Sequence, residues 1–185
     1  RTTEDIFTGS SHPMPSGRIY GGQVLAQSLL AAERTLPEDR AVHSMHGYFL
    51  RPGDASQGIT IAVDRIHDGR SFSTRRSQAY QNGVPIFSMI ASFQDDDPGI
   101  EHAVPMPEGI PGPDSLLPDE QRVDGLPPGV VRMLSDRAAD VRHIDSPMFL
   151  PSADSRVPQQ GVWMRMKAPL PDDQRIHRAL SLIHI

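Results

Sequence analysis

Residues 21–36 read GGQVLAQSLLAAERTL, and this stretch decides the fold. From Gln23 to Leu36 its residues are strong helix formers, and Pro37 ends the run. Its apolar and small residues spread around most of the helical circumference, and no charge appears before Glu33. A helix of this kind is buried on most sides rather than along one stripe. We therefore predict a central helix that other elements surround.

Four strand-like runs follow this helix: Val42–Leu50, Ile59–Arg65, Phe72–Tyr80 and Val84–Phe93. In the second run, Ile59, Ile61 and Val63 alternate with other residues in the period of two expected of a half-buried strand. The dipeptides Asp68-Gly69 and Asn82-Gly83 separate the later runs and predict hairpin turns, because Asn and Gly tolerate positive φ. A buried helix followed by an antiparallel meander predicts a sheet curled around a helix, which is an α+β fold.

The pattern changes after Gln94, where eight prolines between Pro98 and Pro128 prevent a regular ladder. Beyond them we predict short strands at Val141–Ile144 and Val162–Lys167 and a helix over Asp172–Leu180. These elements are too few to bury their own apolar faces. The expected organisation is a first module over 1–94, a Pro-rich linker over 95–130 and an incomplete second module over 131–185.

Composition excludes several classes of function. The net charge of −5 and the absence of a Lys/Arg run leave no basic surface for nucleic acid. Zero cysteines exclude disulfides, a thiol nucleophile and Cys-ligated zinc. No stretch approaches the roughly 20 apolar residues of a membrane helix, and the first residues lack a signal-peptide core. We expect no membrane partner and a cytoplasmic location. Because the chain begins at Arg1, we expect the natural N-terminus to be missing.

Four motifs fall in order along the first hundred residues: GGQVLAQ (21–27), VHSMHGYFLRPG (42–53), DGRSFSTR (68–75) and QNGVPIF (81–87). Through them the chain closely resembles the type II (TesB-like) acyl-CoA thioesterases. The resemblance implies two hot-dog modules in one chain and hydrolysis of fatty acyl-CoA to free acid and CoA. It also implies acyl-CoA as the partner, no metal or redox cofactor, and a homo-oligomer for the full-length protein. A eukaryotic member would reside in the peroxisomal matrix.

The resemblance also implies where catalysis resides. In the family an aspartate that opens the second module's helix, a serine or threonine, and a glutamine activate the attacking water. After Arg175-Ile176-His177 the chain reaches Ile185 without such an aspartate. The catalytic residues are thus unknown within this chain and are expected beyond its end. Residues 180–185 resemble translated adapter sequence. We expect a gene fragment that is inactive by itself.

Gly21, Gly22 and Gln23 are candidate substrate-binding residues. A helix start leaves backbone N–H groups unpaired at the positive end of the dipole, which suits an oxyanion where bulkier side chains would block approach. Gln23 could donate a hydrogen bond to the carbonyl or to a water. The structural alternatives are a tight turn for the glycines and a plain polar N-terminal residue for Gln23.

His46 is the weak catalytic candidate, because its near-neutral pKa would suit a general base. It lacks a visible carboxylate partner, and the alternative is a hydrogen-bonded structural histidine. His43 stands three residues before it, which on a regular strand places the two rings on opposite faces. We therefore expect no metal site.

Arg70, Ser71 and Phe72 complete the candidate substrate-binding residues, since guanidinium groups suit the phosphates of CoA. Arg75 and Arg76 are further candidates for phosphate binding. The alternative is solvated hairpin charge, favoured more for Arg76 than for Arg70.

Two other functions remain open. A non-catalytic acyl-CoA binding or assembly module would use the same fold without the aspartate. A hydratase on this fold would need an Asp and a His together on the first module's loop and helix, and Gly21-Gly22-Gln23 supplies neither.

Overall fold

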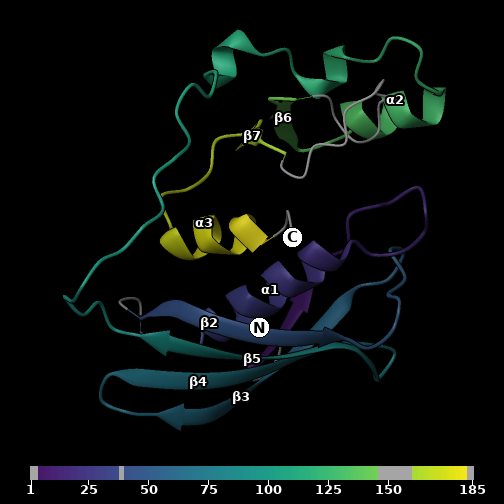
Figure 1. The fold of residues 1–185 in the computed structure, drawn as a ribbon. Coiled ribbons are helices and arrows are strands. Elements are labelled where there is room, and N and C mark those ends of the chain that lie inside the picture. Colours follow the sequence, from purple (N-terminus) through teal and green to yellow (C-terminus); the bar gives the residue numbers. More distant parts are fainter. Residues whose placement is uncertain (1–3, 38–39, 146–159, 183–185) are drawn as a thin grey trace. The chain divides into compact units, whose positions relative to one another are not determined.

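The computed structural model describes residues 4–37, 40–145 and 160–182 (Figure 1). The chain falls into two compact units. Unit 1 comprises Arg1–Ile100 together with Asp172–Ile185, and unit 2 comprises Glu101–Pro171. The C-terminal segment thus groups with the first hundred residues. The predicted boundaries after residues 94 and 130 concern the modules of a complete protein and stay a prediction.

Unit 1 contains a five-stranded antiparallel sheet in the order β1-β3-β4-β5-β2. Its strands are β1 (Ile6–Gly9), β2 (Ala41–Phe49), β3 (Ile59–Asp68), β4 (Phe72–Gln81) and β5 (Val84–Gln94). All four predicted strands are confirmed. Asn82 and Gly83 have φ values of 50° and 75°, as the predicted hairpin turn requires. The sequence analysis missed β1, whose four residues pair with β3 and carry too short a pattern to be recognised.

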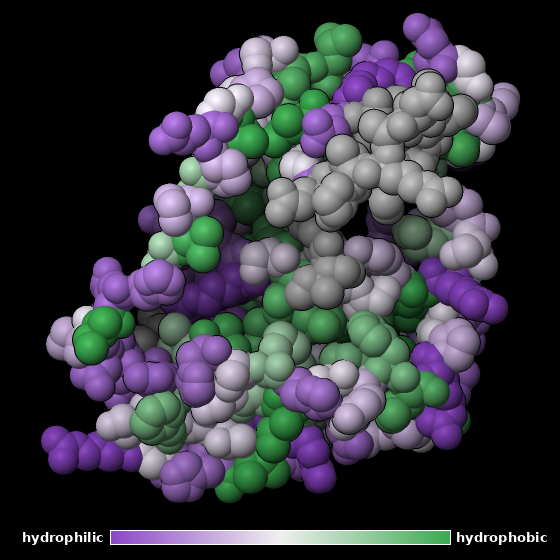
Figure 2. All heavy atoms as spheres, in the orientation of Figure 1, coloured by the Kyte–Doolittle hydropathy of each residue, from purple (hydrophilic) through white to green (hydrophobic). Residues whose placement is uncertain are grey.

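Helix α1 (Gly21–Glu33) lies against the sheet, and every one of its residues is buried or half-buried. It contributes Leu29 and Ala32 to a core that Phe87 and Phe93 of β5 complete, and all four are fully buried. The predicted buried helix and the α+β class are confirmed. On the surface visible in Figure 2, hydrophobic and hydrophilic residues are interspersed.

Helix α3 (Gln174–Ser181) packs on α1, and Figure 1 shows it on the side away from the sheet. Its N-cap is Asp173, whose carboxylate accepts a hydrogen bond from Arg175 N at 3.0 Å. Ala179 is buried and Leu182 packs against the core. Because the sheet covers one side of α1 and α3 the other, α1 needs apolar residues around most of its circumference.

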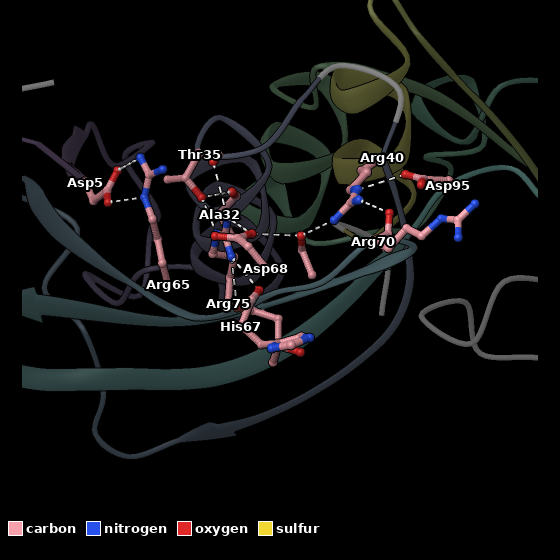
Figure 3. Close-up of polar contacts among 12 residues, drawn as sticks. Asp5, Ala32, Thr35, Arg40, Arg65, His67, Asp68, Arg70, Arg75 and Asp95 are labelled. Atoms are coloured by element: carbon pink, nitrogen blue, oxygen red, sulfur yellow. Dashed lines mark hydrogen bonds and ion pairs between the residues drawn. The ribbon is translucent and has the colours of Figure 1, made fainter.

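A network of polar contacts lies at the C-terminal end of α1 (Figure 3). The Arg75 side chain is 1% exposed, and its Nε donates to Thr35 Oγ1 at 2.7 Å. Its Nη2 donates to Asp68 Oδ1 at 2.7 Å, and its Nη1 donates to His67 O at 3.1 Å. Nearby, Arg40 pairs with Asp95 at 2.8 Å. These contacts tie the segment after α1 to the β3–β4 turn.

Unit 2 contains η1 (Pro113–Ser115), η2 (Asp119–Gln121), α2 (Pro128–Ser135), β6 (Ala139–His143) and β7 (Val162–Met166). β6 and β7 pair as an antiparallel ladder, which confirms both predicted strands. Helix α2 is absent from the predicted elements because Pro127 and Pro128 stand at its start, although a proline at the first helical position is compatible with a helix. His143 Nδ1 lies 2.9 Å from both carboxylate oxygens of the buried Asp119, which joins η2 to β6. Within the described ranges, no helix is long and apolar enough to cross a membrane.

Candidate functional site

A groove of about 370 Å³ opens at the N-terminal end of α1. Its lining comes from the segment before α1, the first turn of α1, the chain after β2, and β5: Arg18, Ile19, Gly21, Val24, Phe49, Leu50, Arg51, Pro52, Gly53 and Ile86. The volume falls within the ~300–1,000 Å³ typical of small-molecule sites. Three of the four resemblance motifs, GGQVLAQ, VHSMHGYFLRPG and QNGVPIF, meet here although they are distant in sequence.

Two glycines allow the groove walls to approach one another. A Cβ at Gly21 would lie 3.1 Å from the Phe49 ring, and one at Gly53 would lie 2.8 Å from Ile19 Cδ1. The chain turns at the end of β2, where Leu50 N donates to Ile86 O at 2.9 Å. Side chains at either glycine would therefore push the walls apart or fill the groove.

The first turn of α1 presents unpaired N–H groups at this groove. Tyr20 O accepts from Gln23 N at 3.1 Å and from Val24 N at 3.4 Å. Among the described residues, no acceptor meets the amides of Gly21 and Gly22, and the first turn contains no acidic side chain. The positive end of the helix dipole is therefore not neutralised locally, which suits a partial negative charge on a ligand.

Gln23 is engaged in a structural role. Its Nε2 donates to Ser10 O at 2.9 Å, and its Oε1 accepts from His12 N at 3.2 Å. Gln27, one turn later, also donates to Ser10 O at 2.9 Å. Both glutamines thereby hold the segment that follows β1 against α1. To contact a substrate, the Gln23 amide would have to release one of these bonds.

The structure separates the candidate substrate-binding residues into two groups. Gly21, Gly22 and Gln23 begin α1. Arg70 and Ser71 lie in the β3–β4 turn and Phe72 begins β4, near the C-terminal end of α1. There Arg70 O accepts a hydrogen bond from Arg40 Nη2 at 2.6 Å, close to the Arg75 network. A helix of 13 residues is about 20 Å long. A small group therefore cannot touch both sets at once, although an extended ligand could.

The histidines lie on the solvent face of the sheet. His46 pairs in register with the exposed Ile90, and its ring contacts Tyr48 with centroids 4.7 Å apart. Within the described part of the chain, no carboxylate is hydrogen-bonded to His46. The Gly21 amide lies on the face of the sheet that α1 covers. The sheet therefore separates His46 from the groove.

The prediction that His43 lies on the opposite face from His46 is wrong. A β-bulge between Val42 and Ser44 shifts the register by one residue. The His43 ring therefore meets Ser92 Oγ at 2.9 Å and the Phe72 ring at 5.8 Å, on the face that carries His46. No group of three potential metal ligands occurs among the described residues.

Arg75 and Arg76 are both occupied. The guanidinium of Arg75 is buried and bonded within unit 1, so it cannot reach a phosphate in solvent. Its proposed role in phosphate binding is wrong, because the alternation of β4 turns Arg75 toward α1. Arg76 is exposed on the other face, where it pairs with Asp64 at 2.8 Å.

Glu33, the first charge of the α1 stretch, lies in an environment that the sequence did not predict. Its side chain is 1% exposed, and neither carboxylate oxygen has a hydrogen-bond partner among the described residues. Burial raises the pKa of Glu33 to about 7, although Arg178 and Arg175 of α3 oppose the rise. The one available signal was a lone charge in an otherwise buried helix.

A second hollow of about 510 Å³ lies beside β1, β3 and β4, with Thr8, Thr60, Tyr80 and Asn82 among its lining residues. It is larger, but its lining contains no charged side chain and no free helix terminus. The groove at α1 has both, and we therefore treat it as the candidate site.

Comparison with known proteins shows that the chain is similar to acyl-CoA thioesterases. Residues 10–94 match the family model described as the acyl-CoA thioesterase N-terminal domain. Human acyl-coenzyme A thioesterase 8 is 42% identical over 122 residues, which are 65% of this chain and 38% of that protein.

Solved structures extend the likeness over the whole chain. The acyl-CoA thioesterase II TesB2 of Mycobacterium marinum is 38% identical with a TM-score of 0.74, over 100% of this chain and 64% of that one. A protein from Alicyclobacillus acidocaldarius described as having a hot-dog fold gives a TM-score of 0.72 at 20% identity, over 96% and 64% of the two chains. This confirms the hot-dog fold. The chain spans less than two thirds of the length of these relatives. Residues 10–94 are therefore similar to the acyl-CoA thioesterase N-terminal domain, and the chain as a whole is similar to acyl-CoA thioesterases.

Proposed function

We propose that the complete protein hydrolyses fatty acyl-CoA thioesters to free fatty acid and CoA. The observation that supports this function best is the groove at the start of α1, which Gly21 and apolar side chains line and where the first helical turn leaves backbone N–H groups unpaired. The groove lies in a domain that matches the acyl-CoA thioesterase N-terminal domain. The likeness to acyl-CoA thioesterases supports the choice of substrate class.

In the reaction, the oxygen of a water bonds to the thioester carbonyl carbon, the C–S bond breaks, and the CoA thiolate leaves and takes up a proton. The amides of Gly21 and Gly22 would donate hydrogen bonds to the oxyanion that forms on the carbonyl oxygen. Val24, Phe49 and Ile86 would hold the adjoining part of the acyl chain. Arg70 at the far end of α1 would meet the phosphates of an extended CoA.

The base that activates the water is not assigned to a residue of this chain. His46 is disfavoured because the sheet separates it from Gly21. We propose that the aspartate, the serine or threonine, and the glutamine of the family follow position 185. A cytoplasmic or peroxisomal location and a homo-oligomeric full-length protein are parts of the same proposal.

The thioesterase proposal predicts that the 185-residue chain turns over decanoyl-CoA at less than about 1% of the rate of a longer chain. The expected cost of removing a catalytic base is about 10²–10⁴-fold. The longer chain is the same protein extended through the downstream reading frame of its gene. Release of free thiol measures both rates. Full turnover by the 185-residue chain would refute our placement of the catalytic groups.

The same experiment separates the enzyme from a non-catalytic acyl-CoA binding module. That alternative is favoured by the absence, among the described residues, of a carboxylate lining the groove. Binding of decanoyl-CoA by the longer chain without release of thiol would support the binding module and exclude the enzyme.

A substitution at Gly21 tests the groove itself. Gly21→Val places a branched side chain against the Phe49 ring and over the helix amides, and we expect at least a tenfold loss in decanoyl-CoA affinity. Gly99→Val is the matched control, because a side chain at Gly99 meets nothing within 4 Å. Isothermal titration calorimetry measures both. Equal affinities of the two variants for decanoyl-CoA would show that the groove is not part of the binding site.

A further inference from the structure

The groove at α1 carries two positive charges at its border. Arg18 and Arg51 both line it, and within the described ranges neither forms an ion pair with a carboxylate. Arg51 Nη1 donates to Pro85 O at 2.9 Å, which leaves its other N–H groups available. The neighbouring Asp54 carboxylate accepts hydrogen bonds from Ser56 and Gln57 and forms no ion pair with either arginine among the described residues.

This pair of arginines differs from most others in unit 1. Four arginines there are each neutralised by an aspartate, at 2.7 or 2.8 Å: Arg40 by Asp95, Arg65 by Asp5, Arg75 by Asp68 and Arg76 by Asp64. Neither groove arginine has such an ion pair in the described part of the chain, and both lie in the groove that begins at the amides of α1. An anionic group is the complementary ligand.

The walls beside these charges are apolar. Phe49 is 57% exposed although its ring packs against Phe87 with centroids 4.9 Å apart, and Ile19, Val24 and Ile86 line the same groove. An aromatic side chain with more than half of its surface in solvent gains free energy when an apolar ligand covers it. The charged border and the apolar walls together fit an amphiphile.

We infer that this groove binds a free fatty acid, with the alkyl chain along Phe49 and Ile86 and the carboxylate at Arg18 and Arg51. In acyl-CoA, the long pantetheine arm separates the phosphates from the acyl chain. Arginines that border the acyl groove are therefore too close to that chain to reach the phosphates. A carboxylate joined directly to the chain has the required spacing.

This inference rests on the proposed function only for the source of the ligand, which would be the reaction product. Bound there, the fatty acid would occupy the acyl groove and compete with the next acyl-CoA molecule. The groove would then act as a site of product inhibition.

Calorimetric titration of the 185-residue chain with decanoate, decanol and decanoyl-CoA tests the inference. We expect decanoate to bind at least tenfold more tightly than decanol, since a hydrogen-bonded charge contributes that much. Each methylene added between octanoate and decanoate should tighten binding by up to about fourfold.

Variants test which residues bind the carboxylate and which bind the alkyl chain. Arg51→Gln and Arg18→Gln should each weaken decanoate about tenfold and leave decanol unchanged. Phe49→Ser should weaken both ligands, and its exposed position makes folding tolerant of the change. Arg132→Gln is the matched control, because Arg132 is 85% exposed and lies in unit 2. Circular dichroism confirms that each variant is folded.

Several results would overturn the inference. These are no binding of decanoate, equal binding of decanol, or a loss in Arg132→Gln that equals the loss in Arg51→Gln. A dimer that sedimentation shows to dissociate in Phe49→Ser would assign the groove to a second copy instead. Hydrolysis of decanoyl-CoA by the longer chain without decanoate binding would refute this inference and leave the proposed function standing. Decanoate binding without hydrolysis of decanoyl-CoA by the longer chain would refute the proposed function and leave this inference standing.

Discussion

Arg75→Ala is expected to lower the free energy of unfolding of unit 1 by about 3–5 kcal/mol. The guanidinium of Arg75 donates to Thr35 Oγ1, Thr35 O, His67 O, Thr74 O and Asp68 Oδ1. Its removal leaves buried acceptors without donors and opens a cavity beneath the end of α1. Urea denaturation followed by circular dichroism measures the loss.

Arg76→Ala is the matched control for this prediction. It removes the same side chain one residue later, but Arg76 and its partner Asp64 are 51% and 50% exposed. Exposed ion pairs contribute at most about 1 kcal/mol. If the two variants lost equal stability, the Arg75 network would not be a determinant of the fold.

Glu33→Gln is expected to make the protein more stable than the wild type above neutral pH. Burial raises the pKa of Glu33 from 4.5 to about 7 in the folded protein, so the folded state holds a proton that the unfolded chain releases. The cost of ionising Glu33 is absent below pH 4.5 and grows as the pH rises toward 7. The variant carries no such cost at any pH.

We therefore expect the stability difference between Glu33→Gln and the wild type to grow by about 2–3 kcal/mol between pH 5 and pH 8. Urea denaturation at several pH values measures it. Glu108→Gln, at an exposed position in unit 2, is the control and should show a flat difference. A flat difference for Glu33→Gln as well would show that Glu33 ionises without cost.

The charges of α3 give this prediction a second test. Arg178 and Arg175 favour the ionised form of Glu33, and Asp173 disfavours it. Arg178→Gln should therefore raise the pKa of Glu33 further. The variant should then lose more stability than the wild type as the pH rises from 5 to 8. A smaller loss would contradict the placement of Arg178 beside Glu33.

Local patterns predicted most of unit 1. The helix formers after Gly22, the alternation in Ile59–Val63 and the Asn82-Gly83 turn each act over a few residues, and the structure has the corresponding elements. Two of the elements that were not predicted, β1 and α2, carried weak or conflicting local signals. β1 has only four residues, and α2 begins among prolines.

The candidate site was less predictable. The sequence identified Gly21 and Gly22, but it grouped them with Arg70, Ser71 and Phe72, which lie at the other end of α1. It could not find Arg18 and Arg51 as a pair, because only the turn after β2 brings the two segments together. The distance in space between two motifs depends on how the chain folds and not on the order of the motifs in the sequence.

The sequence by itself determined the central helix, the meander and the likeness to the acyl-CoA thioesterases, because these depend on local residue preferences and on motif order. Only the tertiary structure decided which charges are buried. Arg75 and Arg76 are neighbours with the same side chain, yet one is 1% and the other 51% exposed. Glu33 is a buried acid on α1, against which α3 packs, and Arg178 and Arg175 of α3 act on its pKa. The physical reason is that desolvation and pairing of a charge are set by atoms from distant parts of the chain.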